Sequence, residues 1–93
     1  MVVGVITWEI QIFDARSLKE KRKVVKSLKE RLRSRFNLSV AETDYQDSWQ
    51  RAELTAVIVA TDRPYADKVL NKADALVESA ALGRIAGSWR EFY

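Results

Sequence analysis

Hydrophobic and polar positions alternate with a period of two along residues 2–13, a pattern typical of a β-strand. One side of this strand carries Val2, Gly4, Ile6, Trp8, Ile10 and Ile12, and the other carries Val3, Val5, Thr7, Glu9 and Gln11. The first set is apolar throughout, whereas the second mixes apolar and polar residues. We therefore expect a long strand with one buried face and one mixed face.

The pattern changes to a helical period after residue 16. Ser17 and Glu20 form a capping box, in which Ser17 is the N-cap and the Glu20 side chain reaches back to it. Lys21 projects toward the apolar side of this helix, and we expect its long side chain to extend over the edge of the sheet. The apolar stripe comprises Leu18, Val25, Leu28, Leu32 and Phe36, with Val24 at its edge.

Two further segments follow the first helix. Residues 38–44 resume the alternating pattern, and residues 45–51 form a polar connection with one large aromatic side chain at Trp49. Residues 52–61 are rich in β-branched side chains and apolar on both faces. Such a segment predicts a strand in the middle of a sheet.

A second helix and a last strand complete the chain. Asp62 and Pro64 mark the helix start, because Asp is a good N-cap and Pro is tolerated only in the first turn. Residues 85–93 return to a period of two, and Gly87 within them indicates a β-bulge or a close backbone approach. The apolar positions of the second helix recur at Tyr65, Val69, Ala73, Leu76 and Ala80.

The predicted order of elements is β-α-β-β-α-β within a single domain of residues 1–93. Connections of this length favour the α+β class with a ferredoxin-like split βαβ arrangement. We expect a four-stranded antiparallel sheet with strand order 4-1-3-2 and both helices on one face. The two longest apolar strands then lie at its centre.

Composition narrows the chemistry. The 93 residues are 47% hydrophobic and 31% charged, which is typical of a soluble globular domain, and we expect a cytoplasmic protein without a membrane segment. The chain has no Cys and no His, which excludes Ser-His-Asp and Cys-His catalysis and ordinary zinc sites. We predict that the protein is not an enzyme and that it uses no cofactor and no metal.

One acidic cluster bears on the metal question. Glu42, Asp44 and Asp47 have the oxygen ligands that Mg²⁺ prefers. Asp residues are equally common in turns, where their side chains bond to nearby backbone groups. We favour the turn interpretation.

Positive charge is concentrated in one segment. Ten of the sixteen Lys and Arg residues lie between Arg16 and Arg35, with only Glu20 and Glu30 as acids. This segment has a formal charge of +8, whereas the whole chain has +3. Five of its cations form a row about a third of a turn from the apolar stripe: Lys19, Arg22, Lys26, Lys29 and Arg33.

A row of charges is usually only a solvated helix face. Here the neighbours are like charges three or four residues apart, which destabilise a helix by about 0.2–0.5 kcal/mol per pair. A sequence that accepts this cost on one face favours an anionic partner. We predict that the row binds RNA phosphates.

Two other surfaces are candidates for contacts. The mixed faces of the central strands carry four valines: Val3, Val5, Val57 and Val59. An apolar patch of this kind favours contact with another surface, and we predict a homodimer that forms through the sheet faces or an edge strand. In the connection, Trp49 either anchors the loop on the domain, which we favour, or contacts a partner together with Arg51. We assign Trp8 to the core and Trp89 to the core or the open face.

A longer stretch resembles a known family. SLKEKRKVVKSLKERLRSRFNLSVAE (residues 17–42), followed by QDSWQRAEL (residues 46–54), is similar to the bacterial YlxP-like family. The chain departs from the pattern at Tyr45, where relatives would be expected to carry His. The resemblance implies a ferredoxin-like fold and, through the transcription and translation factors encoded beside such relatives, a role in ribosome assembly or RNA handling. It supplies no catalytic residues.

Together these observations predict a non-enzymatic RNA- or ribosome-associated protein that contacts phosphates through its first helix. The alternative is a dimeric ferredoxin-like module that binds a small anionic ligand or a protein partner. An acylphosphatase-type enzyme is a third, distant possibility. It requires a Gly-rich phosphate loop after the first strand, where this chain has Asp14, Ala15 and Arg16.

Overall fold

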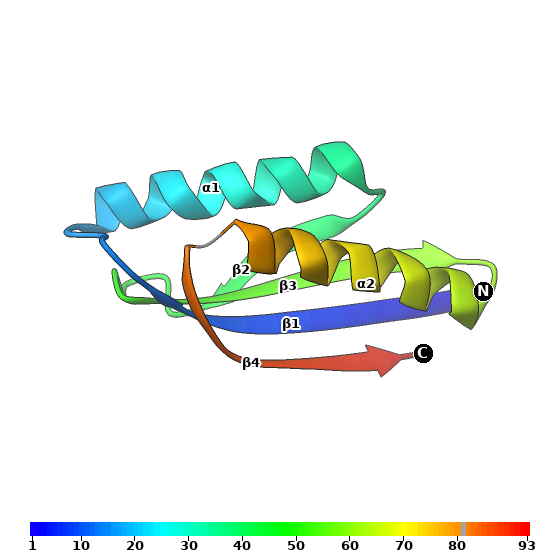
Figure 1. The fold of residues 1–93 in the computed structure, drawn as a ribbon. Coiled ribbons are helices and arrows are strands. Elements are labelled where there is room, and N and C mark those ends of the chain that lie inside the picture. Colours follow the sequence, from blue (N-terminus) through cyan, green and yellow to red (C-terminus); the bar gives the residue numbers. More distant parts are fainter. Residues whose placement is uncertain (81) are drawn as a thin grey trace.

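A computed structural model describes residues 1–80 and 82–93 of the chain (Figure 1). The order of elements within these residues is β-α-β-β-α-β, as predicted. The elements are β1 (Val2–Ile12), α1 (Leu18–Arg35), β2 (Ser39–Asp44), β3 (Arg51–Ala60), α2 (Arg63–Ser79) and β4 (Gly83–Phe92). The boundaries of the strands lie within one or two residues of the predicted ones.

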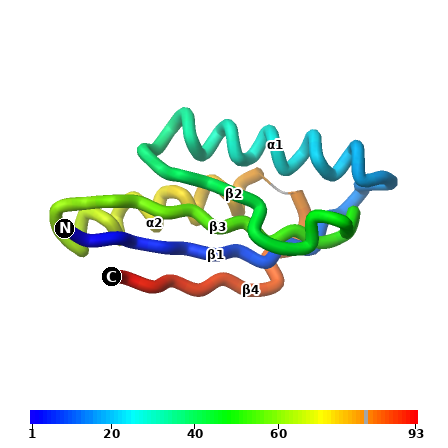
Figure 2. The backbone as a smooth tube through the Cα atoms, turned by 180° about the vertical axis from the view of Figure 1, so that it is seen from behind, coloured from blue at the N-terminus to red at the C-terminus, as the bar shows by residue number. Residues whose placement is uncertain are grey.

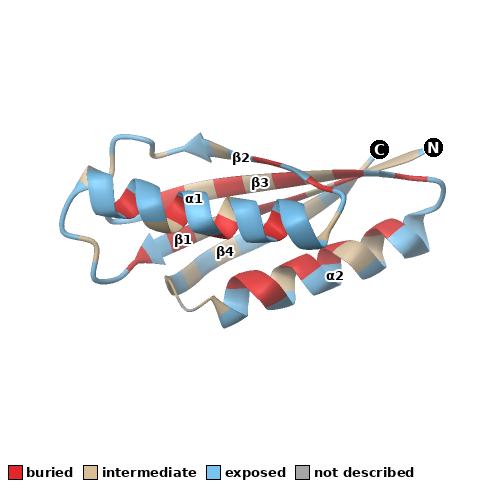
Figure 3. Cartoon of the chain, turned by 90° about the horizontal axis from the view of Figure 1, so that it is seen from above, coloured by how far each residue is buried: buried red, intermediate tan, exposed pale blue. Residues whose placement is uncertain are grey.

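The strands that the structure describes form one antiparallel sheet in the order β2-β3-β1-β4. This order is the predicted 4-1-3-2 arrangement written from the other edge, and the ferredoxin-like fold is thereby confirmed. Both helices cover the same face of the sheet, and their buried positions point toward it (Figures 1 and 3). The other face remains open.

The ends of the chain meet at one end of the sheet. Val3 and Tyr93 exchange two backbone hydrogen bonds of 2.9 Å, which extend the pairing of β1 with β4 (Figure 2). The two termini therefore lie side by side on neighbouring strands.

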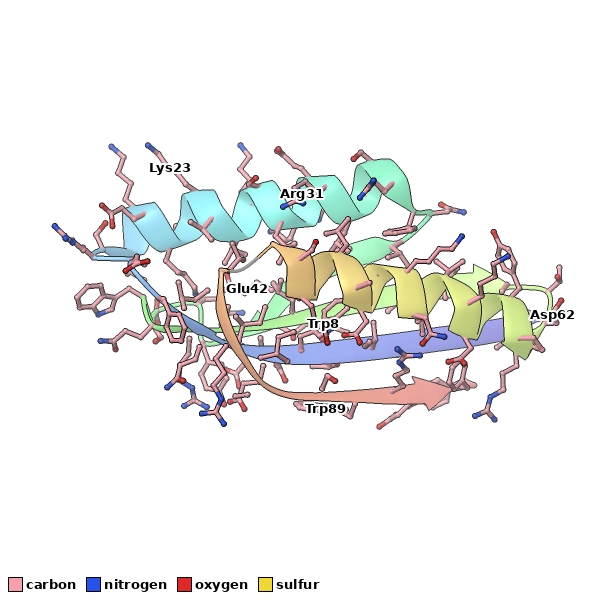
Figure 4. The ribbon with its side chains drawn as sticks, in the orientation of Figure 1. Trp8, Lys23, Arg31, Glu42, Asp62 and Trp89 are labelled. Atoms are coloured by element: carbon pink, nitrogen blue, oxygen red, sulfur yellow. The ribbon has the colours of Figure 1, made fainter. Side chains whose placement is uncertain are left out.

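Trp8 connects the central strand to α2. Its side chain is fully buried, and its indole N–H donates a 2.8 Å hydrogen bond to Asp74 Oδ1. Burial of an indole without a partner would leave its donor unsatisfied, so this bond completes the core position that the sequence predicted. The label in Figure 4 marks Trp8 between the sheet and α2.

The buried face of α2 differs from the predicted one. Tyr65 is 55% exposed and Val69 only half-buried, while the buried residues are Ala66, Leu70, Ala73, Leu76 and Val77. The helix is thus rotated by about one residue from the expected register. One physical reason lies in β1, where Gly4 has no side chain: a Cβ there would lie 3.2 Å from Leu70 Cδ1, so the glycine makes room for Leu70.

The predicted irregularity at Gly87 is present. Glu9 pairs with Gly87, but the next residue of β1, Ile10, pairs with Ile85, so Ala86 is an extra residue in β4. This arrangement is a β-bulge. The close backbone approach that Gly87 also suggested occurs instead at Gly83, where a Cβ would lie 1.8 Å from the Gln11 carbonyl oxygen.

The two glycines of β4 provide a matched pair of substitutions. We expect Gly83→Ala to lower the free energy of unfolding by about 1–3 kcal/mol or more, because the methyl group would displace the β1 backbone. Gly87→Ala places its Cβ 3.8 Å from the Trp89 ring, an ordinary contact, and should leave the urea unfolding midpoint nearly unchanged. Equal midpoints for the two variants would contradict the close approach at Gly83.

Candidate nucleic-acid interface

The start of α1 is capped as predicted, with one difference. Ser17 Oγ accepts a 3.2 Å hydrogen bond from the Glu20 amide. The Glu20 carboxylate reaches back one residue further than a standard capping box and accepts from the Arg16 amide at 2.6 Å. The local sequence therefore sets where the basic helix begins.

Lys21 sets the rotation of this helix. Its side chain is completely buried between α1 and β2, rather than extended over the sheet edge as the sequence suggested. Its ammonium group forms an ion pair with the Glu42 carboxylate and donates a 2.9 Å hydrogen bond to the Tyr45 carbonyl oxygen. The sequence signal was available, since Lys21 lies on the apolar side of the helix and Glu42 continues the inward side of β2 begun by Val40.

The candidate row lies outside this contact. Lys19, Arg22 and Lys26 are exposed, and Lys29 is half-buried. In residues 1–80 and 82–93, no carboxylate lies within ion-pair distance of these four side chains. The row therefore presents positive charge that no partner of the described chain neutralises.

Arg33, the fifth member of the row, has a structural contact. Its guanidinium donates a hydrogen bond to the Val40 carbonyl oxygen of the edge strand β2. This bond places the row on the side of α1 next to β2, because residues three and four apart share a helix face. A phosphate contact by Arg33 remains a prediction, and its replacement would also disturb the fold.

Other cations of α1 lie outside the row. Figure 4 shows Lys23 extending from α1 away from the sheet, and Arg31 is exposed on another side of the helix. Arg35 lies at the end of the helix and faces a hollow shared with α2. The positive charge of α1 is thus divided among several directions, of which the row is one.

A polar cluster of Glu9, Tyr45 and Arg51 lies at the connection between β2 and β3. Arg51 forms an ion pair with Glu9, donates a 3.0 Å hydrogen bond to the Tyr45 hydroxyl and lies 4.0 Å from the centre of its ring. Hydrogen bonding to Glu9 raises the pKa of the Tyr45 phenol and also raises the pKa of Arg51. Arg51, a predicted partner contact, is thus engaged within the chain, and Trp49 is 39% exposed in the same connection.

The four valines lie together on the open face of the sheet. Val3 is directly opposite Val59, and Val5 is opposite Val57. Trp89 lies on this face too, because it pairs with Thr7, and is 49% exposed. Of the two positions that the sequence allowed for Trp89, the structure selects the open face (Figure 4).

Beside the valines, the open face carries hydroxyl groups that bond to one another within the chain. The hydroxyl groups of Thr43 and Thr55 are 2.8 Å apart, and those of Thr55 and Thr7 are 3.2 Å apart. Thr43 also donates to a Glu53 carboxylate oxygen at 2.9 Å. This row of hydroxyl groups separates the valines from the Arg51 cluster.

Two of the three acidic residues near the connection have partners of their own. Glu42 accepts from Lys21, and Asp44 Oδ1 accepts a 2.7 Å hydrogen bond from the Tyr45 amide. Within the described ranges, no group of three or more potential metal-binding side chains lies together. Neither described helix is long and apolar enough to cross a membrane.

The sheet, the helices and the basic row define a ferredoxin-like α+β protein with a strongly basic first helix. Residues 3–88 match the family described as "Protein of unknown function (DUF503)". The uncharacterized protein YlxP of Bacillus subtilis (strain 168) is 38% identical over 78 residues, which cover 84% of this chain and 85% of that protein. The chain therefore belongs to this family, and the predicted YlxP-like membership is confirmed.

Solved structures show the same fold at low identity. The structural-genomics protein YJCS is 15% identical, with a TM-score of 0.56 and 96% of each chain covered. A de novo designed protein with a ferredoxin fold is 11% identical, with a TM-score of 0.55, and the match covers 100% of this chain and 83% of the design. These similarities concern the fold alone.

The buried ion pair below the row can be tested directly. Lys21→Met keeps an apolar side chain of similar length but leaves the Glu42 carboxylate without its cation. We expect a loss of about 3 kcal/mol in the free energy of unfolding, since breaking a buried pair costs about 3–5 kcal/mol and the Glu42 side chain is still 14% exposed.

The control is the double variant Lys21→Met/Glu42→Leu, which removes both charges. It should recover most of the lost stability in urea unfolding, because an apolar pair often replaces a buried ion pair at little cost. A double variant as unstable as Lys21→Met would show that the uncompensated carboxylate is not the cause.

Proposed function

We propose that this protein is a non-enzymatic, cytoplasmic RNA- or ribosome-associated protein that contacts phosphates through one side of α1. The observation that carries the proposal is the exposure of Lys19, Arg22 and Lys26 in one row, without a neutralising carboxylate in the described chain. Phosphate oxygens are the partners that supply such compensation in nucleic-acid complexes.

The length of the row fits a nucleic-acid backbone. Lys19 and Lys29 are ten residues apart, which corresponds to about 15 Å along the helix axis. A row of this length is long enough for its four cations to contact successive phosphates of a nucleic-acid strand. The buried Lys21 holds α1 in one orientation. The backbone positions that carry the exposed cations are therefore fixed before a partner binds, which lowers the entropic cost of binding.

The proposal predicts a defined salt dependence. Four phosphate contacts give a slope of log affinity against log salt of about −3.6 for a duplex, or about −2.8 for a single strand. In Arg22→Gln/Lys26→Gln, binding to a fluorescein-labelled RNA hairpin should weaken and the slope should fall in size by about 1.8, as measured by anisotropy.

A charge-matched control separates the row from net charge. Arg31→Gln/Arg84→Gln also removes two exposed cations, but neither belongs to the row. This control should bind RNA nearly as the parent does. A salt-independent affinity of the parent, or equal loss in both double variants, would overturn the assignment.

The patch of Val3, Val5, Val57 and Val59 on the open face supports the second part of the proposal, that two copies of the protein associate. Face-to-face pairing about a two-fold axis requires a self-complementary surface, and an uncharged patch meets this requirement better than a charged one. The patch joins the two central strands, and Val59 at its end is 62% exposed. We propose a homodimer in which these faces cover one another.

Val59→Lys tests the dimer without disturbing the core. The substituted residue is exposed in the monomer, so the fold should persist while two opposing charges prevent pairing. Light scattering should give a dimer mass for the parent and a monomer mass for Val59→Lys, whereas Ser27→Lys on the exposed side of α1 should remain dimeric. A monomeric parent at micromolar concentration would contradict this model of association.

A further inference from the structure

A groove lies between the C-terminal end of α1 and the face of α2 that borders it. One part has a volume of about 290 Å³, and a second part of about 500 Å³ shares Arg35, Phe36 and Lys72 with it. The two hollows are therefore neighbouring parts of one surface. Their volumes are in the range of small-ligand sites, roughly 300–1,000 Å³.

The groove is positively charged. Arg35, Lys68 and Lys72 line it, and the lining includes no acidic residue. None of these three cations has a carboxylate within ion-pair distance in residues 1–80 and 82–93. An anion in the groove would meet several cations without displacing an internal partner.

In the sequence of α2, no acid stands three or four residues from Lys68 or Lys72, and the fold uses two of the acids of this helix elsewhere. Asp67 forms an ion pair with Arg90 of β4 at 2.8 Å. Asp74 accepts the hydrogen bond from the buried Trp8. Lys68 and Lys72 are consequently left as like charges four residues apart, an arrangement that is unfavourable for the helix by itself.

Aromatic and apolar groups complete the lining. Phe36 is half-buried at the end of α1, and Tyr65 is 55% exposed at the start of α2, with Val69 between the cations. The exposed position of Tyr65 is one of those that differ from the predicted apolar stripe. A large exposed ring beside a cationic hollow offers a stacking surface for a planar group.

We propose that this groove binds a mononucleotide, with its phosphate on Lys68, Lys72 and Arg35 and its base against Tyr65 and Phe36. The two kinds of lining match the two parts of such a ligand, a phosphate monoester and a planar ring. The site is separate from the RNA-binding row, because Arg33 places the row next to β2 whereas Arg35 faces α2. It therefore goes beyond the proposed function.

The ligand test uses adenosine 5′-monophosphate, adenosine and inorganic phosphate as separate probes. In titrations followed by amide chemical shifts, the monophosphate should bind at least about tenfold more tightly than either fragment, because only it engages both kinds of lining. The shifted amides should include those of Phe36, Tyr65, Lys68 and Lys72. Absence of binding at millimolar monophosphate, or shifts confined to the row on α1, would overturn the proposal.

Variants separate this site from the RNA-binding row. Lys68→Gln/Lys72→Gln should weaken monophosphate binding by about tenfold or more while RNA binding changes little. Arg22→Gln/Lys26→Gln should show the reverse, and Tyr65→Ala should reduce the preference for the monophosphate over inorganic phosphate. Urea unfolding confirms that each variant is folded. Unchanged monophosphate affinity in Lys68→Gln/Lys72→Gln would refute the groove even if RNA binding by the row were established.

Discussion

The buried ammonium group of Lys21 is the constraint on which the surface of this protein depends. A charge in the core is tolerated only when it is paired and hydrogen-bonded, and its two acceptors come from Glu42 in β2 and from the Tyr45 carbonyl that follows. Rotation or sliding of α1 would separate the charge from both. The same contact holds the turn at Tyr45, whose φ of 61° lies in the left-handed region. One side chain thus fixes a helix and a loop together.

This fixed rotation divides the cations of α1 between two regions. Arg22 and Lys26 lie in the row beside β2, while Arg35 borders α2. In α2, Asp67 and Asp74 are bonded to β4 and β1, and no acid stands three or four residues from either lysine of the groove to compensate it. The positive surfaces therefore depend on the positions of the acidic residues as well as on the positions of the Lys and Arg residues.

The open face of the sheet is likewise divided between side chains that bond within the chain and side chains that do not. At one end, Glu9, Arg51 and Tyr45 bond to one another, and threonine hydroxyl groups form a row beside them. At the other end, Val5 and Val57 pair with each other, with Glu91 and Ser39 as their outer neighbours, and no element of the described chain covers them. Burial of apolar area favours association at that end, because roughly 25 cal/mol is gained per Å² removed from water.

The sequence by itself determined the order of elements, the sheet order and both helix N-caps. It also indicated an irregularity at Gly87, which the structure shows to be a β-bulge. Period, capping and glycine signals are local, and the order of elements with its connection lengths favours one sheet order. The family could also be identified from the sequence, because the stretches 17–42 and 46–54 resemble it. Only the tertiary structure decided the partner of Lys21, the bond of Arg33 to β2, the rotation that exposes Tyr65, and the groove beside it. These features depend on contacts between elements distant in sequence: a helical period defines a broad apolar arc, and the neighbouring elements select which part of that arc is buried.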